Sequence, residues 1–103
     1  MSDEATGRAA GTKDPDDLPR IDFSTFILSL STSALYHLGL VEDPQTRERA
    51  EPELPLASQT IDTLALLEEK TRGNLEDEER RLLESLLYEL RMRFVEVSQS
   101  RRA

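Results

Sequence analysis

The stretch FSTFILSLSTSALYHLGLV, residues 23–41, contains no charged side chain, although charged residues make up 33% of the chain. At 100° per residue, one arc of a helix here would carry Phe23, Phe26, Ile27, Leu30, Ala34 and Leu38. Asp22 is a good N-cap and Gly39 a good helix stop, so a helix is predicted over residues 22–38. The stretch therefore predicts a helix with a wide apolar surface that other protein must cover.

A second helix is predicted over residues 55–72. Pro55 suits a first helical turn, and Gly73 suits the position just after a helix. One face of this helix would carry Leu56, Ala57, Thr60, Ile61, Leu64, Leu67 and Thr71.

A third helix is predicted over residues 76–97. Its apolar face would consist of Leu82, Leu83, Leu86, Leu87, Leu90, Phe94 and Val97. Acidic residues open this helix and arginines come late, which complements the helix macrodipole. Glu89 and Arg93 are spaced to form a supporting ion pair.

The remaining segments are polar. Residues 42–53, with Pro44 and Pro52, predict a connection between the first two helices. Residues 1–20 predict a disordered acidic tail, and residues 98–103 a frayed end. Short connections favour antiparallel neighbours, so the predicted fold is all-α, a small three-helix domain over residues 21–97.

Composition excludes several function classes. The net charge is −8 with no cluster of basic residues, so we expect no nucleic-acid partner. The chain has no Cys and a single His, so we expect no zinc site, and no cofactor motif is present. The first residues are acidic and lack the apolar core of a signal peptide, so we expect a cytoplasmic protein.

The uncharged stretch also raises the question of a membrane. Its 19 residues reach the length of a transmembrane span. However, it contains six Ser or Thr residues and a His, and acids flank it where basic and aromatic anchors are typical. A peripheral membrane role for residues 23–41 remains an alternative hypothesis.

A catalytic or ligand-binding role is a further alternative. His37 lies one helical turn after Ser33, but a nucleophile also needs an orienting acid and an oxyanion site. Glu68 falls inside the apolar arc of the second helix and Arg93 at the edge of the third. With His37 they form a candidate polar cluster, or their charged ends reach solvent along the helix edges. No catalytic or metal-binding residue is predicted.

Six apolar side chains lie off the main helical faces and are candidate interface residues: Leu28, Leu35, Leu66, Tyr88, Met92 and Val95. One exposed apolar residue needs no explanation, but several in a small domain indicate a further contact surface. Small domains with few aromatic residues also often gain stability by oligomerising. The sequence therefore favours a non-enzymatic protein that forms a homo-oligomer, a dimer first, or docks on another protein.

Several segments of the sequence resemble those of a known family: IDFSTFILSL (21–30), ALYHLG (34–39), QTIDTL (59–64), EKTRGNL (69–75) and LLYELRMRFVE (86–96). Together they are similar to the small bacterial proteins called domain of unknown function 1844, over residues 21–97. The resemblance implies a bacterial origin and an intact single domain, and it supplies no catalytic residues. The family pattern has a Thr-type cap where this chain has Glu76, so Asn74 is an alternative cap of the third helix.

Overall fold

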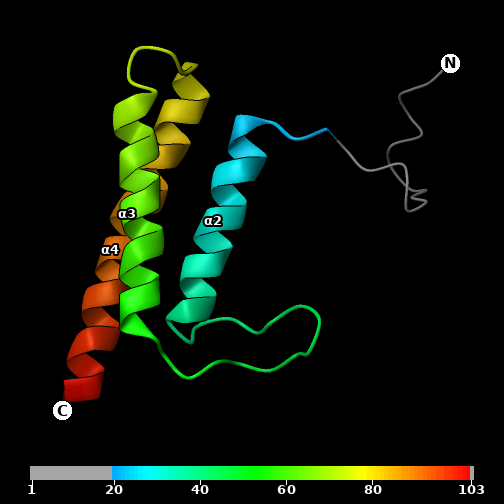
Figure 1. The fold of residues 1–103 in the computed structure, drawn as a ribbon. Coiled ribbons are helices and arrows are strands. Elements are labelled where there is room, and N and C mark those ends of the chain that lie inside the picture. The colour runs from blue at the N-terminus through cyan, green and yellow to red at the C-terminus, as the bar shows by residue number, and fades with distance from the viewer. Residues whose placement is uncertain (1–19, 103) are drawn as a thin grey trace, which may run out of the picture.

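The computed structural model describes residues 20–102, which form three α-helices (Figure 1). These are α2 (Phe23–His37), α3 (Leu54–Lys70) and α4 (Asp77–Arg102). Helix α3 runs antiparallel to the other two, and each helix contacts both others. The described part is therefore a small all-α domain, as predicted. Residues 1–19 of the predicted tail lie outside the described residues.

Both predicted ends of α2 are confirmed. The backbone N–H of Thr25 donates a 2.8 Å hydrogen bond to Oδ1 of Asp22, which caps the helix and lowers the pKa of that carboxyl. Gly39 follows the helix with φ +78°. Its N–H donates to the carbonyl of Tyr36, and the N–H of Leu40 donates to that of Leu35. This pair of bonds is the Schellman motif, which needs a residue in the left-handed region.

The start of α4 is fixed by Glu76. Its backbone N–H donates a 2.9 Å hydrogen bond to Oε1 of Glu79, which is half of a capping box. Asn74, the alternative cap, is not used. The helix then passes its predicted end at Val97 and reaches Arg102. Residues 98–102, expected to be frayed, are helical because neither Gly nor Pro follows Gly73 to stop the helix.

The core lies where the three helices meet. It is built from side chains that are nearly or fully buried: Ile27, Ala34, Ile61, Leu64, Leu83, Leu87 and Leu90. Two expectations for α2 were wrong in detail. Phe26 was placed in the apolar arc but stays 41% exposed, because it lies at the edge of that arc, about 100° from Ile27. Leu35 was expected to be left for a partner but is half-buried and packs against the core.

Candidate protein interface on the α3–α4 hairpin

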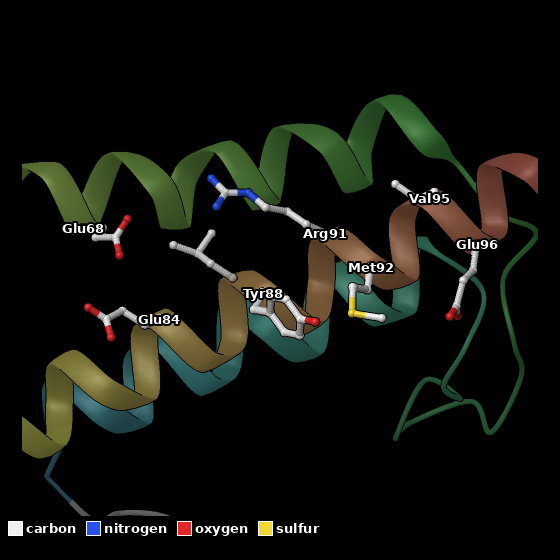
Figure 2. Close-up of a pocket in the computed structure, with 8 residues that line it drawn as sticks. Glu68, Glu84, Tyr88, Arg91, Met92, Val95 and Glu96 are labelled. Carbon is white, nitrogen blue, oxygen red and sulfur yellow. The ribbon is translucent and has the colours of Figure 1, made fainter.

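A groove of about 570 Å³ runs along the seam between α3 and α4 (Figure 2). Glu68 contributes from α3, and the other lining residues come from α4: Glu84, Leu87, Tyr88, Arg91, Met92, Val95 and Glu96. In Figure 2, α2 lies behind α4, so the groove opens on the side of the hairpin that α2 does not cover.

The groove is edged by an apolar strip on α4 that consists of Tyr88, Met92 and Val95 and is called the α4 strip below. These residues recur at i, i+4 and i+7, so they lie on one face of the helix. Their side chains are 69%, 43% and 51% exposed, respectively. All three side chains line the same groove, and grouped exposed apolar side chains are typical of interaction sites. The prediction that all three lie off the buried face of this helix is consistent with their exposure, and their role in an interface stays a prediction.

A second hollow of about 220 Å³ continues the groove toward the start of α3. Its lining residues are Ser58, Ile61, Asp62, Arg91, Phe94 and Val95. Arg91 and Val95 line both hollows, so the two are parts of one groove along the seam. Ile61 and Phe94 belong to or pack against the core, so the groove gives access to core side chains. Only the tertiary structure shows this extension, because the residues come from two helices.

Charges of both signs surround the apolar strip. Oε2 of Glu84 lies 3.5 Å from Arg80, and Oε1 of Glu96 lies 3.3 Å from Arg93. Within residues 20–102, no ion pair is found for Glu68 or Arg91. In Figure 2, Arg91 extends from α4 toward α3, and Glu68 and Glu84 face the seam from opposite helices. Among the described residues, the rim therefore offers a cation and a carboxylate without ion pairs beside an apolar floor.

The other candidate interface residues do not join this groove. Leu66 is 51% exposed but lies two residues after the buried Leu64, on the opposite side of α3 from the core. Leu28 is exposed on α2, and Leu35 packs inside. Sequence reasoning missed exposed Leu56, which it had assigned to the apolar face of the second helix. Leu56 lies in the first turn of α3 and lines an open hollow with Arg101 of α4, and no sequence signal shows this exposure.

The candidate polar cluster of His37, Glu68 and Arg93 does not form. Arg93 instead forms the predicted ion pair, with its Nε atom 2.8 Å from Oε2 of Glu89. The carboxylate of Glu89, and to a smaller extent that of Glu96, raises the pKa of Arg93. Glu68 lies toward the end of α3, at the opposite end of the bundle from the end of α2 that carries His37. The antiparallel course of α2 and α3 separates these residues.

His37 lines a separate hollow of about 280 Å³ with Ser33, Tyr36, Thr32 and residues 42–44. Its Nδ1 atom is buried and has no hydrogen-bond partner among the described residues. The ring of Tyr36 contacts the imidazole ring of His37 edge to face, with the two ring centroids 5.8 Å apart. A general base needs a carboxylate or carbonyl that orients its second nitrogen. Among residues 20–102, no such group bonds to Nδ1 of His37.

Within residues 20–102, no three His, Asp or Glu side chains are grouped so that they could hold a metal ion. None of the helices α2 to α4 is both long enough and apolar enough to cross a membrane. The uncharged stretch of 19 residues falls short because its helix ends at His37, before Gly39.

Comparison with known proteins adds the family. A family model described as "domain of unknown function (DUF1844)" matches residues 20–96. The chain belongs to this family. The match covers α2, α3 and α4 as far as Glu96, and so includes the whole α4 strip. No curated protein and no solved structure matches the chain. The description of the DUF1844 family assigns no activity.

Proposed function

We propose that this DUF1844 domain is a non-enzymatic protein that acts by self-association through the groove between α3 and α4. The observation that carries the proposal is the α4 strip, an exposed row of three large apolar side chains beside a groove of about 570 Å³. Apolar surface removed from water stabilises association by about 25 cal/mol per Å². A helical face from a second copy would remove this row from water.

The size of the face suits a protein partner. Helix α4 has 26 residues and is therefore about 39 Å long, and a pair of helices is roughly 20 Å wide. A face of these dimensions is on the order of the 800 Å² that each partner buries in a stable complex. Pockets for small molecules are more enclosed than this open seam, so a small ligand is a weaker candidate.

Charge favours a protein over a membrane surface. Glu68, Glu84 and Glu96 line the groove, and their carboxylates would be repelled by anionic lipid headgroups. Peripheral membrane helices carry basic polar faces, which this groove does not. The proposal includes a location in the bacterial cytoplasm. The absence of Cys is consistent with a reducing compartment, where disulfides are rare.

Light scattering coupled to size exclusion tests the proposal. At micromolar concentration we expect twice the chain mass of 11.7 kDa. Val95→Glu introduces a charge into the α4 strip and is expected to give the monomer mass. Leu66→Glu is the matched control, because Leu66 and Val95 are both 51% exposed and Leu66 lies outside the groove. Helical circular dichroism would verify that both variants fold.

The proposal fails if the native chain elutes as a monomer over the micromolar range. It also fails if Leu66→Glu disrupts the dimer while Val95→Glu leaves it intact. In that case self-association would use a different face of α3.

A further inference from the structure

We propose that the second copy docks with its α4 antiparallel to the first, so that two α4 strips pack across a two-fold axis. This inference rests on the proposed self-association and adds the orientation of the partner. It concerns the same groove, and it follows from the way charge is distributed along α4.

Helix α4 has two electrostatically opposite halves. In the part of α4 that is centred on Met92, residues 82–89 contain two acidic residues and no arginine, whereas residues 90–101 contain three arginines and one glutamate. The first half is thus net negative and the second net positive. Two α4 helices side by side in parallel would place like charge against like. Antiparallel packing places the acidic half of each helix beside the basic half of the other, which favours that orientation.

The helix macrodipoles favour the same orientation. Each helix has a partial positive charge at its start and a partial negative charge at its end. Side-by-side dipoles attract when they point in opposite directions. The acidic side chains lie at the start of α4, where the helix dipole is positive, and most arginines lie toward its end, where the dipole is negative. At long range the field of the side chains and the field of the dipole therefore partly cancel. Over the short distance between packed side chains, however, the side-chain charges dominate, because each carries a full charge.

The α4 strip itself fits a two-fold axis. In a symmetric dimer the same patch faces itself, and residue i contacts j while j contacts i. Met92 lies between Tyr88 and Val95 in the strip, so an axis near Met92 would bring Tyr88 of one copy to Val95 of the other. The large ring would then lie against a small β-branched side chain, and the strip would be buried without two Tyr88 rings meeting.

Cross-linking tests the orientation, and the chain suits it because it contains no Cys. The single variants Tyr88→Cys and Val95→Cys are prepared in the full chain, one of them with an affinity tag that changes its mass. They are treated with a short bis-maleimide, separately and after mixing and re-equilibration. We expect a cross-linked dimer of the two different variants from the mixture. We expect no cross-linked dimer when either variant is treated alone. Identical sites would be about 10 Å apart along the helix axis, since seven residues separate them.

Controls keep the outcomes distinct. Met92→Cys alone should cross-link in either orientation of the strip, and Leu28→Cys on α2 should not cross-link. Salt gives a second readout, because an antiparallel dimer is held partly by attraction between opposite charges. We expect its dissociation constant to rise between low salt and 0.5 M NaCl.

Self-products from both Tyr88→Cys and Val95→Cys alone would overturn the antiparallel orientation and leave self-association standing. Cross-linking of Leu28→Cys without Met92→Cys would overturn the assignment to the α4 strip. A monomer by light scattering would overturn the proposed function itself, and the orientation with it.

Discussion

The backbone N–H of Glu53 donates a 2.7 Å hydrogen bond to the carbonyl oxygen of His37, which joins the last residue of α2 to the residue before α3. This bond closes the polar connection into a loop with fixed ends. Gly39, two residues after His37, lies close to the same loop. A Cβ atom added at Gly39 would lie 2.9 Å from the carbonyl oxygen of Ala50. The loop is therefore docked against the end of α2, and this docking can be tested.

We expect Gly39→Ala to destabilise the domain more than Gly73→Ala. Both glycines have positive φ, +78° and +82°, so each substitution carries the cost of a left-handed backbone, about 1–2 kcal/mol. At Gly73 the new Cβ would meet nothing within 4 Å. At Gly39 it would also meet Ala50 and Pro52. Urea unfolding of both variants measures the difference, and equal losses would show that the loop yields without cost.

Leu64→Ala should lower the free energy of unfolding by about 2–5 kcal/mol, because Leu64 is fully buried where the three helices meet. The matched control is Leu66→Ala on the same helix, where half of the side chain is already in water. Its effect should stay within about 0.5 kcal/mol. Equal effects in chemical denaturation would contradict the assigned core. Both variants should be compared at one protein concentration, since association would add to stability.

Asp22→Ala should lower the melting temperature at neutral pH and have little effect in strong acid. The hydrogen bond from Thr25 lowers the pKa of Asp22 from its ordinary value of 3.8. A carboxyl whose pKa is lower in the folded state stabilises the fold above the ordinary value. That contribution is lost as the pH falls through the lowered pKa. Thermal melts of both proteins at pH 7 and pH 2 would show this, and a constant difference would contradict it.

Asp43→Ala should loosen the loop without unfolding the helices. Oδ1 of Asp43 accepts hydrogen bonds from the backbone N–H groups of Gln45 and Thr46, at 2.7 and 3.3 Å, in an Asx-type turn. Asp43→Asn keeps an acceptor at this place and is the conservative control. We expect faster amide hydrogen exchange at Gln45 and Thr46 in the alanine variant. Unchanged exchange would mean that the bond between Arg47 and the Asp43 carbonyl holds the turn alone.

Much of the fold was predictable because its signals are local. Asp22, Gly39, Pro55 and Gly73 mark helix ends through bonds and backbone angles that involve only a few neighbouring residues. The ion pair between Glu89 and Arg93 is predictable for the same reason, since four residues of helix place the two side chains together. The end of α4 was missed because helix continuation past Val97 depends on weak propensities and on the absence of a stop signal.

In the candidate interface, too, local features could be predicted from the sequence and packing could not. Sequence by itself determined that Tyr88, Met92 and Val95 share one face, because helical periodicity is set within a single segment. It could not decide which apolar strips other helices would cover. Leu35 turned out to be packed and Phe26 exposed, because the crossing of α2 with its neighbours sets how far each flank is buried.

The charge-free stretch of residues 23–41 illustrates both what the sequence determined and what the tertiary structure decided. Its sequence determined a helix with a wide apolar face and a stop at Gly39. Tertiary structure decided that α3 and α4 cover much of this helix while Phe26 and Leu28 stay exposed, and that a row of three exposed apolar side chains lies on α4 beside the groove. The physical reason is that burial belongs to pairs of surfaces, whereas periodicity and capping belong to one segment of chain.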